Sequence, residues 1–282
     1  MVLSEALDGF DRGILVNGEI INNLRYADDT ALIAGNVKDL QALLDRVSAV
    51  SNAYGLNMNI RKTKFIVVSR EVVDAQLTIA GERVEKVHAF KYLGCWLNER
   101  WDFIQEVRAR IEQARGSFEK MRKLVCRREL SLKCRLRIIR CYVLPVLFYG
   151  IEGWTLTKKL EGKLEAFEMW LYHRMLKISW TARVSNAEVL NRVSKEKEVL
   201  YEIKRRKLQY FGHVMRNEKY RFLQLIMQGK IEGRCRQGRR KTSWMKNLRD
   251  WFGESSMSLF RLAASKVRIA MMIANLRRGG GT

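Results

Sequence analysis

Short apolar runs separated by turn residues dominate the first hundred positions of the chain. Ile14-Leu15-Val16 and Glu19-Ile20-Ile21 flank Asn17-Gly18, a dipeptide that accepts the positive φ angles of a tight hairpin turn. A second hairpin is predicted over Tyr26–Ala34, with Asp28-Asp29 at or near its tip. These patterns predict short strands joined by tight turns.

A helix and further strands follow. Asn36 is a predicted N-cap, apolar residues then recur every three or four positions, and Gly55 is the predicted end of the helix. Residues 1–100 therefore predict an α+β fold, in which an antiparallel sheet carries at least one helix. The further strands are expected at Leu56–Asn59, Phe65–Val68, Leu77–Ile79 and Val84–Val87, with a strand pair at Phe90–Leu97.

After Trp101 the apolar period becomes helical. Apolar residues from Ile104 to Val125 alternate steps of three and four, and basic residues occupy the positions between them. Pro145 is expected to end or kink the next helix, and Ser185 with Glu188 forms a predicted capping box. The later helices are predicted at Leu132–Tyr149, Leu160–Ile178, Val199–Val214, Trp244–Phe252 and Leu259–Leu276.

The charge is large and unevenly distributed. The chain of 282 residues has a net charge of +23, which favours a polyanionic partner such as nucleic acid. The first 60 residues are nevertheless acidic, so the positive charge lies downstream. The densest basic cluster fits contact with a nucleic-acid backbone or a nuclear-localisation signal, two interpretations that the sequence does not separate. It consists of Arg234, Arg236, Arg239, Arg240 and Lys241.

Composition argues against other classes of protein. The five cysteines are odd in number and lack C-x-x-C spacing, so neither a disulfide framework nor a zinc site is expected, and reduced intracellular thiols are the default. No apolar stretch has the length of a membrane span, and the N-terminus does not resemble a secretory signal. Attachment to a membrane surface through basic helices is a weaker alternative.

Asp28 and Asp29 are the leading candidates for chemistry. Adjacent carboxylates at a turn between strands offer the oxygen ligands that Mg²⁺ prefers, and two such ions can assist phosphoryl transfer. The alternative is ordinary turn chemistry, because aspartate side chains bond nearby backbone N–H groups.

Three motifs, in this order, resemble the reverse transcriptases of LINE-type (non-LTR) retrotransposons. They are Tyr26-Ala27-Asp28-Asp29, then Gly55-Leu56-Asn57-Met58-Asn59 with Lys62-Thr63-Lys64, then Phe90-Lys91-Tyr92-Leu93-Gly94. Tyr142–Trp154, Gly212–Arg216 and Gly238–Arg240 are similar to the later part of that family.

The resemblance implies an RNA-directed DNA polymerase that uses Mg²⁺, with Mn²⁺ as an alternative. Asp28 and Asp29 would be catalytic metal ligands, and four residues would contact primer or nucleotide: Tyr26, Lys62, Lys91 and Tyr92. Residues 1–100 would be part of a polymerase palm, 101–180 a helical thumb and 181–282 a basic helical C-terminal region. RNA template, DNA primer and deoxynucleotide triphosphates would be the partners, in the nucleus, the cytoplasm or both, without a membrane.

One part of the family pattern is not found. The family's third palm carboxylate and its fingers region have no counterpart among the residues before Tyr26, so we expect a truncated C-terminal part of the polymerase. A non-catalytic, nucleic-acid-binding remnant of such an element is the alternative function.

Overall fold

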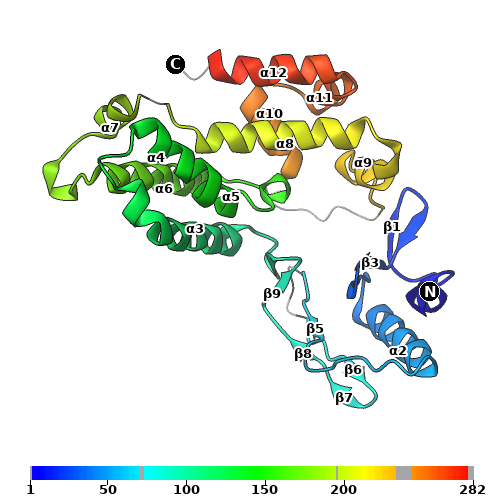
Figure 1. Cartoon of the computed structure of the whole chain (residues 1–282). Coiled ribbons are helices and arrows are strands. Elements are labelled where there is room, and N and C mark those ends of the chain that lie inside the picture. Colours follow the sequence, from blue (N-terminus) through cyan, green and yellow to red (C-terminus); the bar gives the residue numbers. More distant parts are fainter. Residues whose placement is uncertain (1, 70, 72, 195, 233–242, 279–282) are drawn as a thin grey trace. The chain divides into compact units, whose positions relative to one another are not determined.

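The computed structural model describes residues 2–69, 71, 73–194, 196–232 and 243–278 (Figure 1). The chain divides into two compact units. The N-terminal unit comprises Met1–Trp101 and Tyr220–Arg239, and the C-terminal unit comprises Asp102–Lys219 and Arg240–Thr282. Strands lie in the first unit and the second is helical, so the expected α+β class with a helical C-terminal region is confirmed. These units cut across the predicted boundary at residue 180, and the division by motif stays a prediction.

Strands of the N-terminal unit pair in twos. Four pairs are antiparallel and one, β5 with β8, is parallel, so the single antiparallel sheet expected from the sequence is wrong for the residues described. The physical reason is that tight turns join most strands to a sequence neighbour. The strands are β1 (Ile14–Val16), β2 (Glu19–Ile21), β3 (Asn23–Tyr26), β4 (Asp29–Leu32), β5 (Lys64–Phe65), β6 (Thr78–Ile79), β7 (Glu82–Arg83), β8 (Glu85–Lys86), β9 (Ala89–Tyr92) and β10 (Cys95–Asn98).

Three of these hairpins share one turn chemistry. Asn17-Gly18, Ala80-Gly81 and Leu93-Gly94 each place two successive residues at positive φ, the backbone that matches the twist of paired strands. Glycine occupies the second position each time because it adopts positive φ without steric cost.

Helix α2 (Val37–Ala53) supports the strands of the N-terminal unit. The Asn36 side chain accepts a hydrogen bond from the Asp39 backbone N–H, and Gly55 follows the helix at φ +70°, as the sequence predicts. Leu43 and Val47 on one face pack with Leu7 of α1 (Val2–Leu7), a helix that sequence analysis missed. The predicted strand at Leu56–Asn59 is wrong, and the turn that follows it hydrogen-bonds instead to Asn59.

A distant segment completes the first hairpin. After α9 (Arg221–Met227), Ile231 forms an antiparallel bridge with Val16. The Glu232 backbone N–H donates to the Leu15 carbonyl over 3.0 Å, and the Glu232 carboxylate accepts from the Gly18 N–H over 2.8 Å. The N-terminal unit is therefore discontinuous in sequence.

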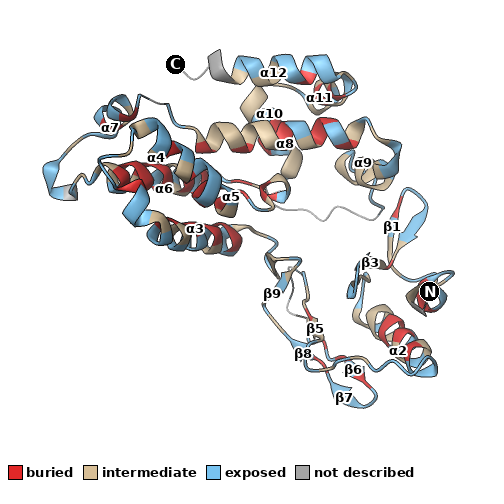
Figure 2. Ribbon diagram, in the orientation of Figure 1, coloured by how far each residue is buried: buried red, intermediate tan, exposed pale blue. Residues whose placement is uncertain are grey.

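A continuous apolar core of the C-terminal unit extends from α3 through α6 to the start of α8, and Figure 2 shows buried residues along these helices. Phe118, Phe167 and Trp170 form an aromatic group within it. The helices of this unit are α3 (Ile104–Val125), α4 (Leu132–Ile138), α5 (Leu144–Leu147), α6 (Lys158–Leu176), α7 (Asn186–Val193), α8 (Val199–Met215), α10 (Trp244–Phe252), α11 (Ser256–Ala263) and α12 (Lys266–Arg278).

Pro145 changes the helix type instead of ending the helix. A π-helical turn, η1 (Ile139–Val143), joins α4 to α5, and the Leu144 N–H donates to the Ile139 carbonyl five residues earlier. Proline has no N–H and crowds the carbonyl four residues before it, so a wider turn accommodates it. Short 3₁₀ turns complete the elements: η2 (Ile151–Gly153), η3 (Trp180–Ala182) and η4 (Glu218–Tyr220).

Two polar groups in this core join distant segments. Glu168 of α6 accepts hydrogen bonds from the Glu198 and Val199 N–H groups at 2.6 and 3.1 Å, so it caps the start of α8. Lys207 of α8 is fully buried, and its Nζ donates to the Trp154 carbonyl and to Asn247 Oδ1. These contacts fix α8 against α6 and α10.

The indole rings of α10 surround the same lysine. Lys207 Nζ lies 4.6 Å from the ring centroid of Trp244 and 5.3 Å from that of Trp251. Each ring is itself anchored, because Trp244 donates to the Glu152 carbonyl and Trp251 to the Glu161 carboxylate. We call this arrangement the Lys207 cage. Among the helices that the structure describes, none has the length and apolar character needed to cross a membrane.

Candidate metal centre

The Asp28–Asp29 pair lies at the tip of the β3–β4 hairpin. Tyr26 pairs with Asp29, which leaves Ala27 and Asp28 as the two turn residues. Ala27 adopts φ +53°, a left-handed conformation that is uncommon for a residue with a Cβ and is often found at functional sites. Both aspartates are exposed, so their carboxylates can reach a ligand in solvent.

The hairpin is tied to the segment around α1 and to α2. Arg25 donates to Ser4 Oγ over 2.8 Å and to Asn23 Oδ1 over 2.7 Å, and it lies 3.7 Å from an Asp8 carboxylate oxygen. Leu32 at the end of β4 packs against the core between the two helices. The tip is therefore presented by a hairpin whose base is fixed on one side.

The chemistry of the pair fits a divalent cation only in part. In the ranges described, neither carboxylate has a recorded hydrogen bond or ion pair, so both keep their oxygens available. The same ranges contain no group of three or more histidine, cysteine, aspartate or glutamate side chains that could hold a metal. Two carboxylates would thus leave most of the octahedral sphere of Mg²⁺ to water or substrate.

Of the other predicted contact residues, Tyr26 lies beside the hairpin tip, whereas Lys62, Lys91 and Tyr92 lie farther along the sequence. Tyr26 leaves 66% of its surface exposed, next to the hairpin tip. Lys62 lies exposed on the turn after Asn59, and Lys91 is exposed on β9 beside the half-buried Tyr92. No recorded contact between described residues joins these side chains to the aspartates, so their assembly into one site stays a prediction.

The β9–β10 hairpin that carries Lys91 is closed by a surface contact between His88 and Glu99. His88 Nδ1 and a Glu99 carboxylate oxygen lie 2.8 Å apart, and the Glu99 N–H donates to the His88 carbonyl. The hydrogen bond to His88 lowers the pKa of Glu99 below its ordinary value. The hairpin is therefore held at its open end as well as at its Leu93-Gly94 turn.

The basic cluster Arg234, Arg236, Arg239, Arg240 and Lys241 lies outside the described residues. The Gly212–Arg216 motif instead contributes to packing in the C-terminal unit. Gly212 allows α12 to approach α8, because a Cβ at this position would lie 3.1 Å from Ile269 Cγ1. Arg216, which ends the same motif, donates to the Ala263 carbonyl over 2.9 Å.

Sequence reasoning missed the residues that position the hairpin. Arg25 precedes the Tyr26–Asp29 motif directly, but its partners Ser4 and Asp8 belong to a segment that lacked a clear pattern. A basic residue next to an acidic motif is the one signal that could have drawn attention to it.

Comparison with known proteins shows that the segment with the β3–β4 hairpin resembles a polymerase family. Residues 2–97 match the family described as reverse transcriptase (RNA-dependent DNA polymerase). A transposon-derived protein of Caenorhabditis elegans is 29% identical over 219 residues, which cover 75% of this chain and 77% of that protein. No solved structure matches.

Two polymerases of mobile elements are also similar. The RNA-directed DNA polymerase from mobile element jockey of Drosophila funebris is 24% identical over 67% of this chain, and its Drosophila melanogaster counterpart is 25% identical over 58%. The matches span 22% and 19% of those two proteins, so this chain covers about a fifth of their length. Residues 2–97 are thus similar to reverse transcriptases, and the longer matches are similar to polymerases of LINE-type mobile elements.

Proposed function

We propose that the chain serves RNA-directed DNA synthesis, with Asp28 and Asp29 as ligands of catalytic Mg²⁺ or Mn²⁺. The observation that carries this proposal is the exposed pair of carboxylates at a two-residue turn, within the segment that matches the reverse transcriptase family. The jockey polymerases, whose name states this activity, support the same proposal.

The residues have separate tasks in this proposal. Bound metal would supply charge neutralisation at phosphate oxygens, the main requirement of phosphoryl transfer. Asp28 and Asp29 would hold the metal, Tyr26 would lie under the primer end, and Lys62 would meet nucleotide phosphates. Lys91 and Tyr92 would steady the primer strand. The contacts of Arg25 with Ser4 and Asp8, next to the turn, would hold the hairpin that carries the carboxylates.

Residues 101–180, which lie mostly in the C-terminal unit, would act as the thumb and bind the template–primer backbone. Helix α3 of this unit buries one apolar face and exposes basic residues elsewhere: Arg108, Lys120, Arg122 and Lys123. Cations that neutralise phosphates release counterions, so binding should weaken steeply as salt rises. RNA template and DNA primer are the proposed partners, and the nucleus, the cytoplasm or both are the proposed locations.

A second candidate function is nucleic-acid binding without polymerisation. The described residues offer two carboxylates at the hairpin and no third one beside them, whereas two-metal sites need more ligands. Such a protein would keep the basic C-terminal unit and its salt-dependent binding.

Primer extension on an RNA template with Mg²⁺ separates the two functions. We expect Asp28→Asn to abolish any extension while leaving template–primer binding within about twofold, because the aspartate contacts metal instead of the nucleic-acid backbone. Asp74→Asn, a change at another exposed aspartate of the same unit, is the matched control. Extension that persists in Asp28→Asn would refute the metal-ligand role. Binding without extension by the unaltered chain would support the second function.

A further inference from the structure

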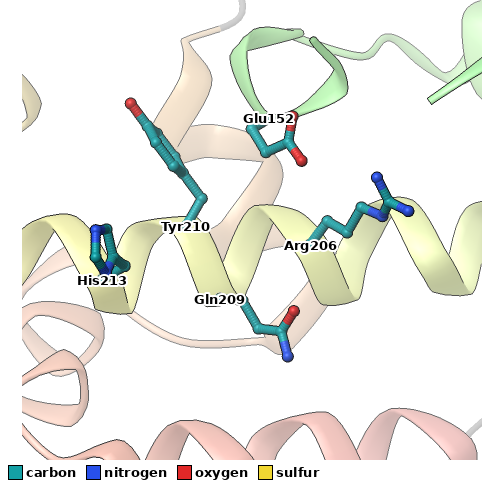
Figure 3. A pocket seen from close by; sticks show the side chains of 5 residues that line it. All are labelled: Glu152, Arg206, Gln209, Tyr210 and His213. Carbon is teal, nitrogen blue, oxygen red and sulfur yellow. The ribbon is translucent and has the colours of Figure 1, made fainter. Parts of the chain in front are cut away.

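An open groove in the C-terminal unit is lined by η2 and α8. Its volume is about 390 Å³, and Glu152, Arg206, Gln209, Tyr210 and His213 line it. Figure 3 shows Arg206 and Tyr210 projecting from α8 toward the side on which Glu152 lies, whereas Gln209 points the other way in this view. The groove therefore brings an aromatic ring, a guanidinium group and a carboxylate together.

The carboxylate of Glu152 is placed by its backbone. Gly150 adopts φ +69° before η2, and the Glu152 carbonyl accepts a hydrogen bond of 2.8 Å from Trp244 Nε1. Within the described ranges, no hydrogen bond or ion pair to the Glu152 side chain is recorded. An acceptor of this kind suits a ligand that donates hydrogen bonds.

The other side chains of the groove are held in fixed positions. The Tyr210 ring packs edge-on against Trp244 at 6.4 Å between centroids. Arg206 Nε donates to Glu202 over 2.7 Å, and its guanidinium carbon lies 5.0 Å from the ring centroid of Phe148. Two side chains that line the groove with Glu152 are thus held by other contacts, and Nε of Arg206 is bonded to the Glu202 carboxylate.

We propose that this groove binds a guanine base of single-stranded nucleic acid. The exposed part of the Tyr210 ring would stack on the base, as aromatic side chains do with unpaired bases. The Watson–Crick edge of guanine carries two adjacent N–H donors, at N1 and at the 2-amino group, which one carboxylate can accept together. Arg206 and His213 flank this position and would meet the phosphates on either side.

Charge explains why a base, and not a phosphate, is assigned to Glu152. In a chain with a net charge of +23, the anionic backbone has many cationic partners, and a carboxylate would repel it. Adenine, cytosine and uracil each lack the pair of adjacent donors that guanine presents, so the carboxylate discriminates among bases. This assignment is independent of the polymerase chemistry proposed for Asp28 and Asp29, because the groove lies entirely within the C-terminal unit.

Fluorescence anisotropy with short labelled RNAs tests the proposal on the full chain. Oligouridine strands carrying a central guanine, adenine or cytosine would be compared with a strand carrying inosine, which lacks only the 2-amino group. We expect guanine to bind at least about fivefold more tightly than the other bases, the low end of discrimination by a bidentate base contact. Inosine should fall between guanine and adenine.

Two variants, each with a matched control, test whether the base binds at Glu152 and Tyr210. Glu152→Gln should remove the guanine preference and leave the affinity for oligouridine unchanged. The control is Glu218→Gln, at an exposed glutamate of the same unit, and it should keep the preference. Tyr210→Leu should lower the affinity for every strand by roughly fivefold or more, because the stacking contact is lost. Tyr210→Phe keeps the ring and should bind with the affinity of the parent. Circular dichroism of each variant checks that the helices remain.

Three outcomes would overturn the proposal. One is equal affinity for guanine and adenine strands, and another is a guanine preference that persists in Glu152→Gln. The third is an affinity for a basic peptide that Glu152→Gln abolishes while the affinity for guanine-containing strands is unchanged. That result would assign the groove to a protein partner. Failure of primer extension would leave the guanine result unaffected, because the two assays probe different units.

Discussion

Raising the pH above neutrality is expected to stabilise the C-terminal unit through Lys207. Burial lowers the pKa of this lysine from 10.5 to about 7. The unfolded chain therefore binds more protons than the folded chain between about pH 7 and pH 10.5, and stability rises with pH across that window. Below pH 7 both states carry the proton, so the group adds no further pH dependence.

The size of the effect follows from the pKa difference. A fall from 10.5 to about 7 corresponds to at most roughly 5 kcal/mol, at about 1.4 kcal/mol for each pH unit. The two carbonyl oxygens and the two indole rings of the Lys207 cage favour the ammonium form. We therefore treat the figure as an upper bound and expect a measurable rise between pH 7 and pH 9.

The perturbation that isolates this effect is Lys207→Met, which keeps the length of the side chain and removes the titrating group. Urea unfolding followed by tryptophan fluorescence would be measured for parent and variant at several pH values. As the pH rises, the free energy of unfolding of the parent should increase relative to that of Lys207→Met. Lys246→Met, at an exposed lysine of α10, should follow the parent. Identical pH dependence in parent and Lys207→Met would refute the argument.

Two further predictions concern contacts within the same unit. The Glu168 carboxylate accepts hydrogen bonds from the Glu198 and Val199 N–H groups and from Tyr172 Oη, and Glu168→Gln leaves only one acceptor oxygen for them. This change should lower the free energy of unfolding by about 1–3 kcal/mol. Thermal unfolding equal to that of the control Glu165→Gln would contradict the capping role. Gly212→Ala would crowd Ile269 and should lower the free energy of unfolding by about 1–3 kcal/mol. Gly116→Ala, in open space on α3, should raise the free energy of unfolding by roughly 0.5–1 kcal/mol. Urea midpoints of the two alanine variants should therefore move in opposite directions.

Features set by neighbouring residues could be predicted from the sequence. The Asn36 cap, the Gly55 stop and the Asn17-Gly18 turn are found as expected, because each depends on a few adjacent residues. The N-cap half of the capping box predicted at Ser185 is confirmed as well, since the Ser185 side chain accepts from the Glu188 N–H. Local signals therefore predicted these caps and this turn.

Features that depend on distant partners could not be predicted. The predicted helix Leu259–Leu276 is divided into α11 and α12 by a break before Lys266, and the apolar period alone does not reveal it. Pairing of Ile231 with Val16 and capping of α8 by Glu168 join segments without a shared sequence signal.

The candidate site shows the same division. The position of Asp28 and Asp29 at a strand turn could be predicted because the turn is local. The contact of Arg25 with Ser4 and the grouping of Glu152 with Tyr210 required the fold, because they join separate elements.

The strand contact between Glu232 and the first hairpin has a consequence for synthesis on the ribosome. The hydrogen bond from Gly18 to Glu232 spans 214 positions, so β1 and β2 emerge long before their third partner exists. At about 5–20 residues per second, that interval is on the order of 10–40 s. The edge of β1 is uncovered throughout, and an uncovered edge is open to pairing with other chains. The nascent protein thus passes through a vulnerable period that ends only after Glu232 has been translated.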